Sequence, residues 1–260
     1  MIQPLATILF LSFSGGADMY DDVRVIARDE AATDGFVLES GGGERTPLLF
    51  YTAAARRASN DDLDALVYKV ANDDQADVVW ENIKPQTRTR LPNQGFSSLP
   101  LGSLARAGRS ERGSPYVQAT DGHIIVQVQI NLRENRPQET QEGDKITSEG
   151  VARRTLARCR GLQAQSAQNI NVNGIPVGSV TGPRGERLVD LVGYCQARGL
   201  ELTTNQRLGT ASFTQGGEQV IIPLAALKIK DGPRWIETRD ISLIKNGRWY
   251  VSYEGLESTR

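Results

Sequence analysis

The sequence of 260 residues is longer than one average domain, and its 39% of hydrophobic and 23% of charged residues are typical of a folded protein. The net charge of −1 argues against a nucleic-acid partner, because nucleic-acid-binding proteins carry a basic excess or a basic patch. The 26 glycines and 11 prolines mark many turns. We predict an α+β protein rich in antiparallel strands, with two small modules in which short helices pack on β-hairpins.

Residues 1–17 are interpreted as a candidate signal peptide. An apolar run from Leu5 to Phe13 precedes the small residues Gly15 and Ala17, as in a secretory signal. No Lys or Arg comes before the run, so the alternative is a buried first strand, or a truncated or mis-started coding region. We expect a secreted or cell-envelope protein, with a cytoplasmic location as the alternative. No membrane span is expected in the mature chain, because no other segment approaches the ~20 apolar residues that a spanning helix needs.

Residues 18–58 form a poorly patterned N-terminal segment, which the glycines Gly41 to Gly43 interrupt. A phosphate-binding loop needs a strand before the glycines and a Lys with a Ser or Thr behind them, and this pattern is absent from the sequence. We therefore predict a flexible turn at the glycines. Leu48 to Arg57 is compatible with either a helix or a strand.

Residues 59–132 are predicted to form the first α+β module. Its first element is a helix that Ser59 or Asn60 caps. The apolar face of this helix consists of Leu63, Leu66, Val67 and Val70. Acidic residues crowd the first turn, where a helix dipole favours negative charge, so they need no metal ion and we expect no metal or cofactor. Residues 97–108 predict a second, short helix.

A β-hairpin with the turn Asp121-Gly122 is predicted over residues 116–132. From Ile124 onward, apolar residues alternate with Gln and Asn, which indicates a strand with one face on a core and the other in water. The only histidine, His123, has no nucleophile motif near it, so we predict an exposed, non-catalytic histidine. This order of elements weakly resembles the short N-terminal domain of secretins and TonB-dependent receptors.

Residues 133–168 are predicted to be a linker followed by a basic helix. The linker is Arg133 to Asp144, and the helix covers Thr147 to Gln168. Its apolar face consists of Ala152, Leu156, Cys159 and either Leu162 or Gln163. Its candidate binding residues are Arg153, Arg154, Arg158 and Arg160. An arginine stripe can bind an anionic cell-wall polymer or another envelope protein, although its more common role is a solvated face paired with acidic side chains.

The two cysteines, Cys159 and Cys195, fall on separate predicted helices. Their spacing excludes a zinc site made of two cysteine pairs. We expect two part-buried free thiols, although a disulfide between them is geometrically allowed. We assign no catalytic residue and no metal ligand.

Residues 169–260 carry the most regular pattern. Three turn pairs predict hairpins: Asn173-Gly174, Gly216-Gly217 and Asn246-Gly247. A helix is predicted by the spacing of Leu188, Leu191, Val192 and Cys195. Gly199 stands where a left-handed residue would end that helix, and a strand is expected directly after it.

This order of elements resembles the copper amine oxidase-like N-terminal domain, also called the stalk domain, of bacterial envelope and secreted proteins. The resemblance is carried by Asn173-Gly174, the helix ending at Gly199, the hairpin from Gln215 to Ile222 and the closing strand from Lys245 to Val251. Despite its name the domain has no copper ligands, so the resemblance implies neither a metal nor an oxidase activity. It implies a spacer, attachment or binding module.

We therefore expect a non-catalytic cell-envelope or secreted stalk or binding module that acts through surface contacts. Two alternatives stay open. The first is a glycan-acting hydrolase, whose pair of carboxylates would not be visible in one-dimensional spacing. The second is an assembly module of a secretin-like envelope machine.

Overall fold

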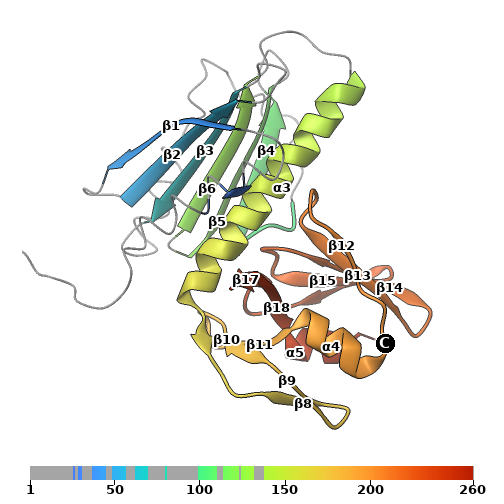
Figure 1. Cartoon of the computed structure of the whole chain (residues 1–260). Coiled ribbons are helices and arrows are strands. Elements are labelled where there is room, and N and C mark those ends of the chain that lie inside the picture. The colour runs from blue at the N-terminus through green and yellow to red at the C-terminus, as the bar shows by residue number, and fades with distance from the viewer. Residues whose placement is uncertain are drawn as a thin grey trace, which may run out of the picture.

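The structure is a computed structural model that describes residues 26, 29–30, 37–44, 49–56, 62–69, 80, 99–109, 114–122, 124–131 and 138–259. The candidate signal peptide, His123 and residues 133–137 lie outside the described residues. Within them, antiparallel strands dominate and a few helices accompany them, which agrees with an α+β fold (Figure 1). None of the helices in these ranges combines the length and the hydrophobicity that a membrane-spanning helix requires.

The N-terminal half contains a six-stranded antiparallel sheet with the order β1-β2-β3-β6-β5-β4. Its strands are β1 (Val37–Glu44), β2 (Leu49–Arg56), β3 (Asp62–Lys69), β4 (Leu104–Arg109), β5 (Pro115–Asp121) and β6 (Ile124–Asn131). The predicted hairpin around Asp121-Gly122 is confirmed as the pair β5 and β6. The segment from Leu48 to Arg57, compatible with a helix or a strand, is the strand β2.

Three predictions of secondary structure for this half are wrong. The glycines Gly41 to Gly43 lie inside β1 and pair with β2, so they do not form a turn. The helix predicted after Asn60 is the strand β3, and the helix predicted within 97–108 gives way to the strand β4. For β3 the physical reason is that Leu63 and Val67, four residues apart, fit one face of a helix and also one face of a strand. Pairing with β2 and β6 decides for the strand.

The long helix α3 (Gln138–Gln163) crosses one face of this sheet and packs on β5 and β6 (Figure 1). It begins earlier than predicted, so residues 138–144 are helical and do not belong to a linker. It also ends before the predicted Gln168, because Gln165–Ser166 is a short strand. Ala152, Leu156 and Cys159 are fully buried as predicted, whereas Leu162 is 43% exposed.

Strand β6 lacks the solvent-exposed face that was predicted for it. All residues from Ile124 to Ile130 are buried, including Gln127 and Gln129. The apolar residues Val126 and Val128 belong to the core that contains α3. The glutamines alternate with them and are buried on the other face, where Gln127 is the register partner of Gln118 on β5. Arg106 on β4 donates hydrogen bonds to Gln118 Oε1 and, at 3.0 Å, to the carbonyl oxygen of Trp80.

The C-terminal half contains two five-stranded sheets, ordered β17-β18-β11-β10-β7 and β12-β13-β14-β15-β16, and the ribbon β8-β9. The strands are β7 (Gln165–Ser166), β8 (Ile170–Val172), β9 (Ile175–Val177), β10 (Ser179–Thr181), β11 (Arg187–Asp190), β12 (Thr203–Asn205), β13 (Thr210–Gln215), β14 (Glu218–Pro223), β15 (Lys228–Asp231), β16 (Arg234–Glu237), β17 (Leu243–Lys245) and β18 (Arg248–Ser252). The helices are α4 (Leu191–Arg198) and α5 (Tyr253–Glu257).

The local predictions for this half are confirmed at its turns. Asn173 and Asn246 have φ angles of 50° and 52° and precede glycines with φ angles of 84° and 74°, as a tight hairpin turn needs. Helix α4 ends at Gly199, which has a φ of 66° and donates its N–H to the carbonyls of Cys195 and Gln196. The predicted helix is wrong at its start, because Leu188 lies in β11 and α4 begins at Leu191. The sequence analysis missed the pairs β10-β11 and β15-β16, and the strand expected directly after Gly199 begins only at Thr203.

One hydrophobic core joins the two halves. It contains Leu63, Val128 and Leu156 from the N-terminal sheet and α3, together with Leu224 and Ile241 from the C-terminal half. A second core lies within the C-terminal half and is built from α4 and the inner faces of its strands. Helix α3 therefore lies between the six-stranded sheet and strand β17 (Figure 1).

Candidate functional site

The structure places the predicted binding arginines in contacts inside the protein. The side chains of Arg153, Arg154 and Arg160 are 3%, 6% and 5% exposed, and that of Arg158 is 27% exposed. The prediction of an exposed anion-binding stripe is therefore wrong for the first three. The reason is tertiary, because α3 has neighbours on both sides and these arginines contact groups from both the N-terminal and the C-terminal half.

Each buried arginine holds two separate parts of the chain together. Arg153 donates to the carbonyl oxygens of Pro100 at 2.7 Å and Leu224 at 3.1 Å, and it pairs with Glu149 one helical turn earlier. Arg154 pairs with Glu30 at 2.6 Å and donates to the carbonyl oxygen of Gln206 at 2.6 Å. Burial lowers the pKa of Arg153, and the Glu149 carboxylate opposes that shift.

Asp121 is a buried carboxylate at which three elements meet. It ends β5, and its side chain is 0% exposed. Arg160 of α3 places Nε 2.6 Å from Asp121 Oδ2, an ion pair that lacks hydrogen-bond geometry. Arg184, from the segment between β10 and β11, donates to Asp121 Oδ1 at 2.5 Å. The carboxylate therefore links the N-terminal sheet, α3 and the C-terminal half.

Two glycines let α3 approach the C-terminal half closely. A Cβ atom on Gly150 would lie 1.7 Å from the carbonyl oxygen of Arg207, and one on Gly161 would lie 1.8 Å from that of Ile244. Eleven residues are about three full turns, so both glycines lie on one face of the helix. Any larger residue would push the helix away from these backbones.

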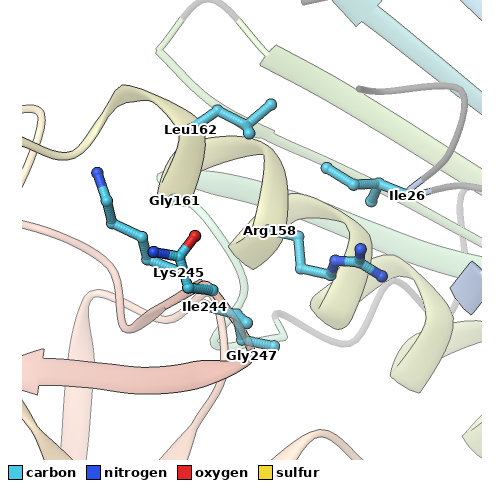
Figure 2. Close-up of a pocket in the computed structure, with 8 residues that line it drawn as sticks. Ile26, Arg158, Gly161, Leu162, Ile244, Lys245 and Gly247 are labelled. Atoms are coloured by element: carbon cyan, nitrogen blue, oxygen red, sulfur yellow. The ribbon is translucent and has the colours of Figure 1, made fainter. Parts of the chain in front are cut away.

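A groove runs between the second half of α3 and the turn that joins β17 to β18. Figure 2 shows Arg158 and Leu162 on the helix, with Ile244, Lys245 and Gly247 on the facing hairpin. This part has a volume of about 380 Å³. An adjoining pocket of about 350 Å³ shares Arg158, Ile244 and Gly247 and extends to Trp249. Both volumes fall in the range of small-ligand sites.

The charged groups of the groove are already engaged by the protein itself. Arg158 donates to Glu30 Oε1 at 2.9 Å and lies 3.6 Å from Asp29 Oδ2. The Lys245 ammonium donates to the carbonyl oxygen of Ala164, at the C-terminal end of α3. Of the described lining residues, Glu30 alone carries a carboxylate, and Arg154 and Arg158 neutralise it.

A second pair of buried carboxylates also has a structural role. Asp240 accepts the backbone N–H groups of Arg184 and Glu186, and the Glu186 carboxylate accepts those of Arg239 and Asp240. Glu186 also accepts the hydroxyl of Ser252 at 2.5 Å. These reciprocal bonds tie the segment before β11 to the segment before β17.

The two cysteines are free and buried, as predicted. Burial raises the pKa of the Cys159 thiol to about 12 and that of the Cys195 thiol to about 12. Both are therefore neutral thiols at physiological pH, whereas a reactive cysteine needs its thiolate form. Among the described residues, no three or more His, Cys, Asp or Glu side chains gather in a way that could hold a metal ion.

The outer face of the sheet β12-β13-β14-β15-β16 is the surface that the sequence analysis missed. Consecutive register pairs place one row of side chains across all five strands: Thr203, Ser212, Ile221, Lys230 and Trp235. At the usual spacing between strands, this row is roughly 19 Å long. The Trp235 side chain is 43% exposed, and the Lys228 ammonium lies 5.3 Å from its ring centre.

This face differs from the helix arginines in its electrostatics. Among the described residues, neither Lys228 nor Lys230 has an acidic partner at ion-pair distance, whereas Arg234 on the inner side of the same sheet pairs with Asp231. The alternation Lys-Ile-Lys-Asp before Gly232 is the signal that could have predicted a strand with two lysines on one face.

Comparison with known proteins returns no match, either to a family model, to a curated protein or to a solved structure.

Proposed function

We propose that the chain is a non-catalytic stalk or binding module that acts in the cell envelope or after secretion through contacts at its surface. The observation that carries this proposal is the attachment of α3 on both sides. Arg153, Arg154 and Asp121 join the helix to segments far apart in the chain, and the glycines allow backbone contact. Charged groups that are engaged in such internal contacts give a rigid body, which holds its outer surfaces at a constant separation.

The resemblance of residues 169–260 to the stalk domain supports the same proposal. In this view the six-stranded sheet, whose strands span residues 37–131, and residues 169–260 are two modules, and α3 is the rigid connection between them. The partner is an anionic cell-wall polymer or another envelope protein. The hydrolase alternative would need a carboxylate pair that faces a common cleft, whereas the buried carboxylates Glu186 and Asp240 bind backbone N–H groups.

Rigidity is tested by spin labels on Leu104→Cys and Val192→Cys, two exposed sites in different halves. The native thiols stay unlabelled at neutral pH because burial raises the pKa of each to about 12. Electron–electron double resonance should give a single narrow distance distribution, as narrow as that of a control pair within the C-terminal half, Ile175→Cys with Val192→Cys. A broad distribution only for the pair between halves would contradict the proposed rigid module.

Binding without turnover is tested by sedimenting the full chain with purified envelope material and measuring sugar release. We expect the chain to be retained and no sugar to be released. Sugar release that continues after repeated purification would establish the hydrolase alternative instead. A chain that is not retained by any envelope fraction would refute the attachment role.

A further inference from the structure

We propose that the outer face of the sheet β12-β13-β14-β15-β16 binds a polysaccharide that carries carboxylate groups, with Trp235, Lys228 and Lys230 as its central contacts. This inference rests on the proposed surface-binding function and names the surface and the class of partner. The face lies in the C-terminal half, on the side of the sheet opposite to its core residues Phe213, Ile222 and Ile229.

The geometry supplies a flat platform with one aromatic ring. Trp235 lies on the edge strand β16, directly opposite Lys230 in the register. Lys228 lies diagonally across from the ring, and its ammonium is 5.3 Å from the ring centre, within the range of a cation–π contact. The negative face of an indole attracts the C–H groups of a pyranose ring, so an exposed tryptophan is suited to stacking on a sugar.

The charges select an anionic sugar over a neutral one. Two ammonium groups stand on neighbouring positions of one face, without an acidic partner at ion-pair distance among the described residues. Glu237 is the register partner of Lys228 and reduces the positive charge at one end of the face. The charge that remains lies beside Trp235 and Lys230. A carboxylate on a sugar stacked against the ring would lie within reach of both lysines.

The rest of the row provides hydroxyl groups for hydrogen bonding. Thr203 and Ser212 continue the line from Lys230 across the sheet, and Thr214 and Gln219 form a neighbouring exposed pair. Hydroxyl and amide groups can both donate to and accept from the hydroxyls of a sugar. A row of roughly 19 Å is long enough to contact several consecutive sugar units.

Two other occupants fit less well. A nucleic acid would be disfavoured by a chain whose net charge is −1. A second copy of the chain that pairs with the edge strand β16 would meet the charged side chains of Arg234 and Glu237, and charged edge residues oppose such pairing.

The experiment titrates the full chain with polygalacturonate, with dextran as the neutral polymer and a DNA oligonucleotide as a polyanion without sugar carboxylates. Trp235 is the exposed tryptophan, so we expect acrylamide quenching of the protein fluorescence to fall when polygalacturonate binds. Binding should weaken as salt rises from 0.1 M to 1 M, where the Debye length falls from about 10 Å to about 3 Å. Dextran should not bind at either salt concentration.

Variants separate this face from the rest of the surface. Trp235→Ala should weaken polygalacturonate binding at least about tenfold, as truncation of an aromatic anchor does, and Trp235→Phe should weaken it less. Lys230→Gln should weaken binding and reduce its salt dependence. The matched controls are Ile175→Ala, an exposed apolar side chain, and Arg187→Gln, an exposed cation on another sheet, and neither should change binding.

Several outcomes would overturn the inference. Equal binding by Trp235→Ala, by Lys230→Gln and by the wild type would show that this face does not bind the polysaccharide, while attachment through another part of the surface would stay possible. Equal or tighter binding of DNA would make the face a nucleic-acid surface. A wild-type dimer that Trp235→Ala converts to a monomer, without any polysaccharide binding, would assign the face to a second copy of the chain. Unfolding curves of each variant in urea verify that the fold is retained.

Discussion

The substitution Gly150→Ala directly tests how closely α3 packs against the backbone of Arg207. Within a helix this change ordinarily stabilises by about 1 kcal/mol, because alanine has the higher helix propensity. Here the new methyl carbon would lie 1.7 Å from the carbonyl oxygen of Arg207, and the gap must widen by about 1.3 Å before it reaches 3.0 Å. The same carbonyl accepts a hydrogen bond from Arg154, which the displacement would disturb.

The expected magnitude follows from these opposing effects. Overpacking of this kind costs about 1–3 kcal/mol, and a disturbed hydrogen bond costs about 1 kcal/mol. After the gain in helix propensity, we expect Gly150→Ala to lower the free energy of unfolding by about 2 kcal/mol. The measurement is urea unfolding followed by circular dichroism, in which the midpoint should fall while the slope stays constant.

Gly143→Ala is the matched control within the same helix. Within 4 Å its methyl carbon would meet only the terminal nitrogen of the Arg207 side chain, at 3.4 Å, which is an ordinary van der Waals contact. This variant should be as stable as the wild type or up to about 1 kcal/mol more stable. If Gly150→Ala were as stable as Gly143→Ala, α3 could not be seated against the backbone of Arg207 as described.

The remaining predictions concern the buried charges and the thiols. Asp121→Asn should lower the free energy of unfolding by about 3–5 kcal/mol, because two arginines lose their counter-charge in a buried site. The control Glu254→Gln, in an exposed ion pair, should change the free energy of unfolding by at most about 1 kcal/mol. Similar urea midpoints for the two variants would contradict the burial of Asp121. Neither Cys159 nor Cys195 should react with a thiol reagent at pH 8 in the native protein, because burial raises the pKa of each thiol to about 12, and both should react in urea. The sign of the pH dependence follows, since a group with a raised folded-state pKa stabilises below its unfolded value and loses that contribution as pH rises. The urea concentration at the unfolding midpoint should therefore decrease as the pH rises from about 9 to about 12, because the thiols ionise in the unfolded chain and stay neutral in the folded protein. The double variant with alanine at both positions should lose less stability over that range. A wild-type midpoint that stays constant over this range would argue against buried thiols.

Local chemistry in the sequence is sufficient to predict the turns and the helix end of the C-terminal half. Asn173-Gly174 and Asn246-Gly247 adopt left-handed conformations, which Asn and Gly tolerate better than other residues, so the hairpins follow from the pairs themselves. Gly199 ends α4 for the same reason. The strand β6 is also evident from its alternating pattern, although the pattern alone does not show what covers each face.

Only the tertiary structure decides the roles of α3 and of the charged residues. Leu63 and Val67 suit a helix or a strand equally, and the strand results from pairing with neighbours that are distant in the sequence. An arginine stripe looks alike whether it faces water or a second layer, and only the contacts of Arg154 with Glu30 and Gln206 show that it is covered. Lys230 and Trp235 meet only because the register of β15 and β16 places them opposite each other. Periodicity reports which residues share a face, whereas the neighbour on that face is a property of the whole fold.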